Sequence, residues 1–354
     1  MIQKIKTATM QDVAKLAGVS MMTVSRVISN EAKVRDKTRD KVMAAIEELD
    51  YQPNLSARSL ASAKSHLIAL FYQNPSEGYV GQLLIGALNK SQSRGYNLVV
   101  SSLDETTDDV ETALKSLVRR NKIEGIILPP PLSDSQRVLD ILMALNIPAV
   151  RISPQRDDHP FPFVCMDEAQ AAFDITEHLI NQGHRKIGFI QGHPDHSGSH
   201  LRYEGYRKAL EKHHIALRDD YVEQGLFTYR SGFQAAVNLV TLKDPPTAIF
   251  ASSDDMAAAT ISAAQKHHLQ VPSMLSVVGF DDAPIASAIW PSLTTVRQPI
   301  LEMAERATDL LIDALKKKPE TEQEMETPPE QNLENILEYQ LMLRETVAAT
   351  KVKV

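Results

Sequence analysis

Hydroxyl and carboxylate side chains recur at helix-capping spacing within residues 9–28 of this chain. Thr9 and Asp12 stand three residues apart and can form a capping box at the start of a helix. Gly18 can adopt the left-handed backbone of a sharp turn, and Ser20 is a second N-cap candidate. The pattern predicts two short helices joined by a turn, a layout that presents its second helix to the major groove of DNA.

The second of these helices has one apolar and one polar face. Val24, Val27 and Ile28 are expected to face inward. In the first helix the residues expected on the inward face are Val13, Leu16 and Ala17. The outward face of the second helix carries the candidate DNA contacts Met21, Met22, Ser25 and Arg26.

A helical hairpin inside a larger domain is the alternative, but a third helical pattern over residues 34–51 argues against it. This pattern completes a three-helix unit whose core includes Val42, Ile46 and Leu49. Asp36 is expected to cap the third helix, because Arg35 is a poor cap. Pro53 stops the helix, and Asn54 can cap one more short helix.

Residues 9–62 resemble the LacI/GalR family of bacterial transcription regulators. The motifs D-V-A-x-x-A-G-V-S-x-x-T-V-S-R-V, T-R-x-K-V and Y-x-P-N-x-x-A-R-x-L occur in the family's order and spacing. The resemblance implies that phosphate or sugar of the DNA is contacted by Ser20, Thr23, Ser25 and Asn54.

The resemblance also implies which residues read the operator. Arg26 is expected to contact a base edge, whereas Met21 and Met22 can offer only apolar contact with thymine methyls. Leu60, with Ala57 as its close-packing neighbour, matches the leucine that two subunits insert into the minor groove.

Charge is divided unevenly along the chain. Residues 1–65 hold 11 basic and 7 acidic residues, a net charge of +4, and the remainder carries −11. A basic head suits contact with phosphate. The one cysteine, Cys165, permits no internal disulfide, and no signal peptide or membrane span is visible. We therefore expect a soluble, cytoplasmic, nucleoid-associated bacterial protein.

Beyond residue 66, short apolar runs alternate with amphipathic helical patterns, which predicts parallel sheets covered by helices. Expected strands are 67–71, 97–100, 125–128, 149–152, 163–166, 186–190, 247–252 and 275–280, and expected helices include 82–94, 109–120, 169–181 and 256–267.

The predicted fold is an all-α helix-turn-helix domain with a hinge helix, followed by a two-lobed α/β core resembling periplasmic binding proteins. The expected domains are 1–53, the hinge 54–65 and the core 66–354. Within the core we expect an N-lobe of about 66–162 and 294–318, a C-lobe of about 163–293 and 336–350, and an acidic loop of about 319–335.

Ligands of such sheets bind beyond the carboxyl ends of the strands. Arg202 matches the family motif R-x-x-G-[YF] and Asp281 matches V-G-[YF]-D-[DN], so the resemblance implies that both grip a sugar. Phe227 stands where the family often places a stacking aromatic. The remaining candidates stand at or just after the ends of predicted strands and are Phe71, Tyr72, Gln73, Ser253 and Asp254. Ser253 departs from the asparagine common in the family.

Three histidines, His193, His196 and His200, lie close together before a predicted helix. Their spacing is not that of a helical zinc site, so we expect no metal and predict that some of them line the cleft beside Arg202. No catalytic motif, phosphate-binding loop or cofactor motif is recognised, and an enzyme is not expected.

Residues 336–344 admit a helix that would oligomerise or a strand that closes the core. Leu341, Arg344 and Thr346 fit the family's closing strand, which we favour, and one apolar repeat is too little for a helical bundle. We therefore predict a homodimer.

The sequence thus predicts a DNA-binding repressor that binds a near-palindromic operator and responds to a small effector, expected to be a sugar or sugar derivative. The alternatives are an activator with the same architecture and a cytoplasmic sugar-binding protein without a DNA role. The latter leaves residues 9–62 unexplained.

Overall fold

The computed structural model describes residues 8–28, 34–51, 65–73, 76–104, 109–155, 159–316 and 335–350. The chain divides into two compact units, Met1–Ser65 and His66–Val354. Asn54, Ala57, Leu60 and most of the predicted acidic loop lie outside the described residues.

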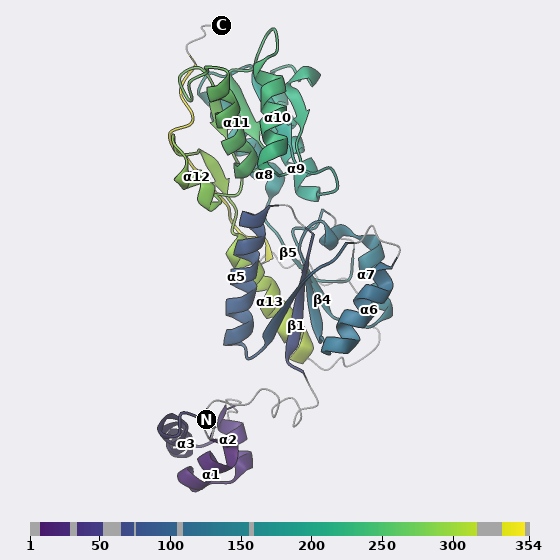
Figure 1. The fold of residues 1–354 in the computed structure, drawn as a ribbon, viewed down its shortest axis with the longest axis vertical. Coiled ribbons are helices and arrows are strands. Elements are labelled where there is room, and N and C mark those ends of the chain that lie inside the picture. The colour runs from purple at the N-terminus through teal and green to yellow at the C-terminus, as the bar shows by residue number, and fades with distance from the viewer. Residues whose placement is uncertain are drawn as a thin grey trace, which may run out of the picture. The chain divides into compact units, whose positions relative to one another are not determined.

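The first unit holds helices α1 (Met10–Ala17), α2 (Met21–Ile28) and α3 (Asp36–Glu48) (Figure 1). The predicted capping box is present: the Thr9 hydroxyl accepts from the Asp12 amide, and the Asp12 carboxylate accepts from the Thr9 amide. Gly18 ends α1 in the left-handed conformation with φ 65°. These local signals therefore fix where the first helix begins and ends.

Two predictions for this unit are wrong. Leu16 is 45% exposed, because α1 is rotated so that Ala14 faces the core with Val13 instead. Asp36 does not cap α3: it is already the first helical residue, and the cap position belongs to Arg35, whose side chain makes no capping bond. The Asp36 carboxylate is thus left to act on the helix dipole alone.

The second unit contains two parallel sheets. The first has the strand order β2-β1-β3-β4-β5 and the second has the order β7-β6-β8-β9. Strands β10 and β11 form a separate antiparallel pair. The strands are β1 (Leu67–Tyr72), β2 (Asn97–Ser102), β3 (Gly125–Leu128), β4 (Ala149–Ile152), β5 (Phe163–Val164), β6 (Ile187–Gln191), β7 (Val222–Gln224), β8 (Ala248–Ala251), β9 (Ser276–Val278), β10 (Thr295–Arg297) and β11 (Gln340–Met342).

Helices cover both faces of the first sheet, and side chains of β1 alternate between them. Ile68 and Leu70 pack toward α5 (Glu77–Ser93) and α13 (Ile300–Lys316), which lie side by side. Ala69 and Phe71 pack instead among residues of the helices on the opposite face, α6 (Val110–Asn121) and α7 (Gln136–Ala144).

The second sheet repeats this arrangement. Phe189 of β6 joins the cluster formed with α8 (Glu168–Asn181) and α9 (Ser197–Lys212). Ile190 points to the other face, toward α10 (Tyr229–Val240) and α11 (Asp254–Lys266). A short helix, α12 (Pro284–Ala288), and two 3₁₀ turns, η1 (Leu132–Asp134) and η2 (Asp219–Tyr221), complete the described elements.

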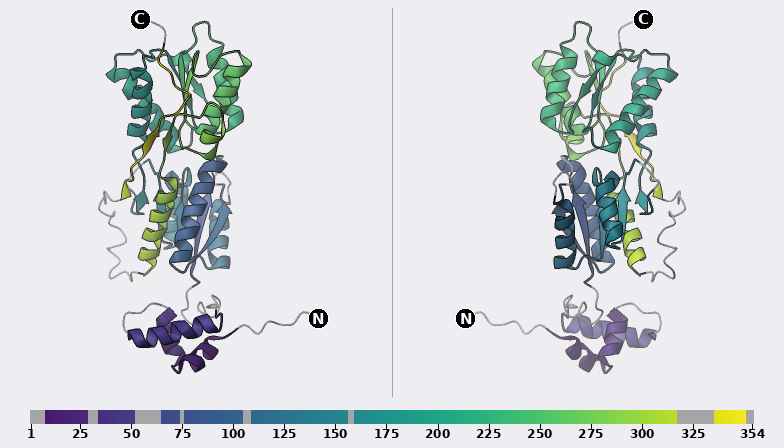
Figure 2. Two further views of the ribbon diagram at one scale, coloured as in Figure 1. Left: turned by 90° about the vertical axis from the view of Figure 1, so that its left-hand side faces the viewer. Right: turned by 90° about the vertical axis from the view of Figure 1, so that its right-hand side faces the viewer.

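The C-terminal segment, drawn in yellow in Figure 2, forms a strand as predicted. Strand β11 pairs with β10, and an isolated bridge joins Ile336 to Cys165. One boundary differs from the prediction. The second lobe was expected to begin at Phe163, but β5 pairs with β4 and so extends the first sheet. Strands β7 and β10 are absent from the predicted strands, whereas the equally short β9 and β11 lie within longer predicted segments.

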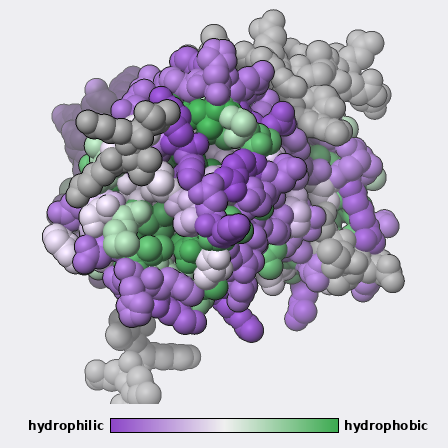
Figure 3. Space-filling model, turned by 90° about the horizontal axis from the view of Figure 1, so that it is seen from above, coloured by the Kyte–Doolittle hydropathy of each residue, from purple (hydrophilic) through white to green (hydrophobic). Residues whose placement is uncertain are grey.

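No helix among the described residues is long and apolar enough to cross a membrane. The face of the molecule drawn in Figure 3 carries hydrophilic side chains over most of its area, with apolar patches between them.

Candidate functional site

The exposed face of α2 carries the predicted DNA contacts. Met21 and Met22 are 53% and 64% exposed, and Ser25 and Arg26 are also exposed. Val24 and Val27 are buried in the core of the unit. The helix therefore presents a row of exposed side chains while its opposite face is buried in the core.

Hydrogen bonds fix the start of this helix. The Ser20 hydroxyl accepts from the Thr23 amide at 3.2 Å and lies 2.9 Å from the Thr23 hydroxyl. Ser20 is thus the predicted N-cap, and its oxygen and that of Thr23 are held side by side at the positive end of α2. Such a paired hydroxyl site at a helix N-terminus is suited to a phosphate oxygen.

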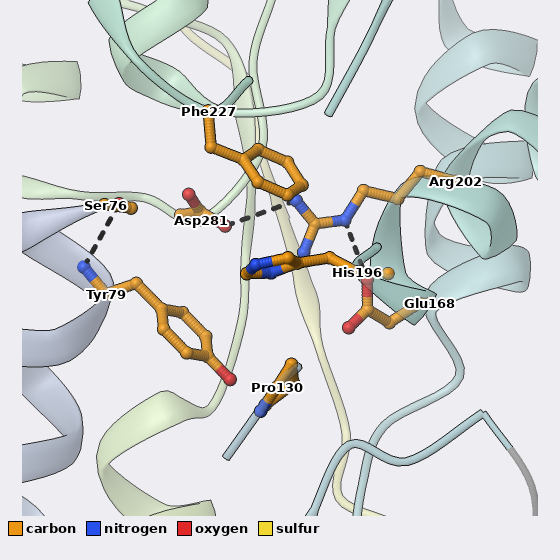
Figure 4. A pocket seen from close by; sticks show the side chains of 9 residues that line it. Ser76, Tyr79, Pro130, Glu168, His196, Arg202, Phe227 and Asp281 are labelled. Atoms are coloured by element: carbon orange, nitrogen blue, oxygen red, sulfur yellow. Dashed lines mark hydrogen bonds and ion pairs between the residues drawn. The ribbon is translucent and has the colours of Figure 1, made fainter. Parts of the chain in front are cut away.

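A second candidate site is a cleft in the second unit. Tyr79 comes from α5, which packs against one face of the first sheet, whereas Arg202 comes from α9 and Asp281 follows β9 of the second sheet (Figure 4). The described residues that line it are Ser76, Tyr79, Pro130, Glu168, His196, Gly198, Arg202, Phe227 and Asp281.

Arg202 is the centre of the cleft and is only 5% exposed. Its Nε donates to Glu168 Oε2 at 2.7 Å, and its Nη1 donates to the Ser252 carbonyl and lies 3.7 Å from Asp281 Oδ1. The guanidinium also stacks on the Phe280 ring, 3.9 Å from its centroid. A charge held by this many partners is fixed in direction, which suits a group that must orient a ligand.

Asp281 faces Arg202 from a strained backbone position, with φ 119°. The Gln298 amide donates to its Oδ1 at 2.6 Å. Burial raises the pKa of Asp281 to about 7, although Arg202 and the Gln298 hydrogen bond act to lower it. Backbone strain of this kind clusters at ligand sites.

An aromatic pair closes one side of the cleft. Phe227 has φ 58°, and its ring lies edge-on to His196 with 5.5 Å between centroids. A Cβ on Gly192 would stand 2.0 Å from the Phe227 ring, so a glycine there is what admits the ring. Burial, with help from His193 and Arg202, lowers the pKa of His196 to about 3, so its imidazole is neutral.

Tyr79 enters from the opposite side. Ser76 caps α5 and accepts from the Tyr79 amide at 3.4 Å. Burial, and then the nearby Glu168 carboxylate, raise the pKa of Tyr79 well above its usual value. Its hydroxyl, the His196 ring and the Glu168 carboxylate face one space in Figure 4, which gives that space donors and acceptors for hydroxyl groups.

Comparisons with known proteins agree on one family. Residues 9–54 match the model of bacterial regulatory proteins of the lacI family, and residues 176–334 match a periplasmic binding protein-like domain. The probable transcriptional repressor ExuR of Bacillus subtilis is 33% identical over 96% of this chain and 98% of its own length. Catabolite control protein A of Priestia megaterium is 33% identical over 87% and 93%. The chain belongs to the LacI family.

Two solved structures of transcriptional regulators match almost the whole chain. The Lac repressor dimer bound to operator and an anti-inducer matches with a TM-score of 0.74 and 29% identity, over 97% of this chain and all of that one. The regulator CelR in complex with cellobiose matches with a TM-score of 0.69 and 28% identity, over 96% and 99%. The predicted fold and the prediction of a DNA-binding regulator rather than an enzyme are thereby confirmed.

The structure brings together three of the eight predicted effector residues, Arg202, Phe227 and Asp281. Two predictions are corrected. Phe71 is fully buried on the far face of its sheet, among residues of α6 and α7. Asp254 is also fully buried: its oxygens accept from the Ala283 amide and the Thr295 hydroxyl, both at 2.6 Å.

The other three predicted residues do not line this cleft. Ser253 caps α11, where its hydroxyl accepts from the Met256 amide. Tyr72 packs on the core, and the Gln73 amide lies 3.5 Å from Asp104. A position at or just after the end of a strand is therefore not enough to place a side chain in the cleft.

Sequence reasoning named His196 only within a group of three and missed Glu168, Tyr79, Ser76, Pro130 and Gly198. Glu168 carried a usable signal, since it follows the predicted strand 163–166 in the same way that Asp281 follows β9. His200 turns back to the Pro194 carbonyl at 2.7 Å. No group of three or more metal-ligating side chains occurs in the described part of the chain.

Proposed function

We propose that this LacI-family protein is a repressor that binds a near-palindromic operator as a homodimer. The observation that carries the proposal is the row of exposed side chains on α2, Met21, Met22 and Arg26, on a capped, well-packed helix. Two copies of such a helix, related by a two-fold axis, would contact two half-sites one helical turn or more apart.

A second copy has a surface to occupy. Ile85 and Leu88 on α5 are 53% and 42% exposed, and Val100 on the edge strand β2 is 43% exposed. Exposed apolar groups of this kind favour association.

The proposal also covers the lobe boundary and the place of action. The N-lobe includes β5 and α13, and the protein acts in the bacterial cytoplasm, on the nucleoid.

The second part of the proposal is control by a sugar or sugar derivative in the cleft around Arg202. A buried guanidinium, two carboxylates and aromatic rings are the groups that grip neighbouring hydroxyls and a sugar face. Ligand binding would move the lobes and release the hinge at residues 54–62, where Leu60 is proposed to enter the minor groove.

Selection from random duplexes tests the operator. We expect the enriched sites to be near-palindromic. Enrichment of asymmetric or unrelated sequences would contradict operator recognition by a symmetric homodimer. Leu60→Ala should then weaken binding to the selected operator far more than to a scrambled duplex. Leu55→Ala in the same segment is the matched control, and equal losses on both duplexes would remove the minor-groove role of Leu60.

Thermal-shift screening tests the effector class. A sugar that binds only the folded cleft raises the melting temperature of the protein by mass action. Arg202→Lys should remove that shift while operator binding is kept. An unchanged dose response in this variant would exclude Arg202 from the ligand site.

A further inference from the structure

The positive charge in the cleft is already paired. Among the lining residues that the structure describes, Arg202 supplies the only lysine or arginine. Glu168 Oε2 stands 2.7 Å from its Nε, and Asp281 Oδ1 stands 3.7 Å from its Nη1. With His196 neutral, these groups carry a net charge of zero or −1, depending on the proton of Asp281.

Glu168 is as buried as the arginine it pairs with, at 5% exposure. It comes from the first residue of α8, whereas Arg202 comes from α9, and these helices pack against each other. Gly198 leaves room for the pair: a Cβ there would lie 2.9 Å from Glu168 Oε2. The pair is therefore built into the packing of two helices and is not an incidental surface contact.

Two carboxyl oxygens of this cluster accept no hydrogen bond from a described residue. Glu168 Oε1 is an acceptor, and Asp281 Oδ2 is an acceptor whenever Asp281 is ionised. The hydrogen bonds found among described residues reach Oε2 of Glu168 and Oδ1 of Asp281, which leaves Oε1 and Oδ2 for a ligand. Burial raises the pKa of Asp281, and Glu168 raises it further, so the site disfavours more negative charge. An incoming anion would meet these oxygens in a low-dielectric space, where like charges repel strongly.

We propose that Glu168 excludes anionic ligands, so that the cleft takes a neutral hydroxylated sugar and rejects sugar phosphates and sugar acids. This inference rests on the proposed function for the ligand class, but the exclusion itself belongs to the cleft and can be measured without knowing the effector.

Inorganic phosphate is the first probe, titrated into the full-length protein by calorimetry. Glu168→Gln keeps the shape of the side chain and an acceptor for Arg202 while it removes the charge. We expect the wild type to show no saturable binding in the millimolar range, and E168Q to bind phosphate at least about ten-fold more tightly. Glu77→Gln removes the same charge from an exposed position outside the cleft and should not change phosphate binding.

Two results of this titration would overturn the proposal. One is wild-type binding of phosphate as tight as in E168Q. The other is an equal gain in E77Q, which would show a general charge effect. Thermal unfolding of each variant establishes that the protein is folded at the titration temperature.

Matched sugars are the second probe: glucose with glucose 6-phosphate, and galactose with galacturonate. Tighter binding of an anionic member to the wild type would overturn charge exclusion and leave the sugar-responsive function standing. If no sugar binds, the proposed effector class fails, whereas the phosphate titration still decides the role of Glu168.

Discussion

In the first unit, the described side chains expected to contact DNA belong to a single run of residues 20–26 at and within α2, where Met21, Met22, Ser25 and Arg26 are exposed. In the second unit, the cleft is assembled from residues as distant in sequence as Tyr79, Glu168 and Asp281, and its charged groups are buried. The contact residues on α2 are accessible to a large, charged partner. The charged groups of the cleft are enclosed and suit a small ligand.

The difference has an energetic consequence. Exposed contact residues carry little of the stability of their unit, so they can vary with the operator at small cost. Buried charges are held by one another, so the loss of one partner leaves an uncompensated charge. We therefore expect mutations in the cleft to affect folding and binding together, and mutations on α2 to affect binding alone.

The largest expected effect comes from Arg202→Ala, which leaves Glu168 and Asp281 buried without their cation. The free energy of unfolding should fall by about 3–5 kcal/mol, measured by urea denaturation followed by circular dichroism. Arg207→Ala, an exposed arginine of the same helix, is the control and should change it by less than about 1 kcal/mol. A loss from R202A as small as the control's would show that the cluster is solvated.

Arg26→Ala should weaken operator binding and leave the stability of the fold unchanged. We expect a loss of about 1–3 kcal/mol in operator binding with no change in melting temperature, measured by fluorescence anisotropy and calorimetry. Lys15→Ala removes the same charge from the exposed face of α1 and serves as the control. If both variants lose operator affinity equally, Arg26 acts by charge alone and reads no base.

A smaller effect concerns pH. Burial raises the pKa of Asp281 to about 7, above the ordinary carboxyl value of about 4. The folded state therefore binds this proton more tightly than the unfolded chain, and the resulting stability is lost as pH rises from about 4 through 7. Asp254 shifts in the same direction, also by burial.

Asp281→Asn should reduce the loss of stability with rising pH, because the amide side chain has no proton to release. Its oxygen can still accept the hydrogen bond from Gln298. The free energy of unfolding, measured at intervals from pH 5 to 8, should fall less in D281N than in the wild type. Asp195→Asn, at an exposed carboxyl, should follow the wild type. Parallel curves for D281N and the wild type would contradict the raised pKa.

The smallest expected effect tests the turn of the first unit. Gly18→Ala should destabilise it by about 1 kcal/mol, because φ is 65° while the added Cβ meets no atom within 4 Å. Gly81→Ala in α5 also meets nothing and should stabilise its helix by about 0.5–1 kcal/mol. Amide hydrogen exchange in α1 and α5 measures both changes in stability. If the two substitutions change stability in the same direction, the positive φ of Gly18 does not explain the effect.

Local signals allowed much of this structure to be predicted. The Thr9 capping box, the turn at Gly18 and the strands over 67–71 and 125–128 depend on neighbours a few residues apart, which the sequence shows directly. Leu16 was misplaced because helical spacing gives a face but not the rotation of the helix against its partners. The strand β5 was assigned to the wrong sheet because only pairing across the chain distinguishes the two.

The sequence by itself determined the position and the exposed face of α2, since its cap, the preceding turn and its face pattern are all contained in residues 9–28. It also marked Arg202, Phe227 and Asp281 as site residues through the motifs or positions they share with the family. Only the tertiary structure decided that Glu168 pairs with Arg202 and that Asp254 is buried away from the cleft. The reason is physical: the burial, pairing and protonation of a charged side chain depend on its neighbours in space, and those neighbours come from strands and helices far apart in the chain.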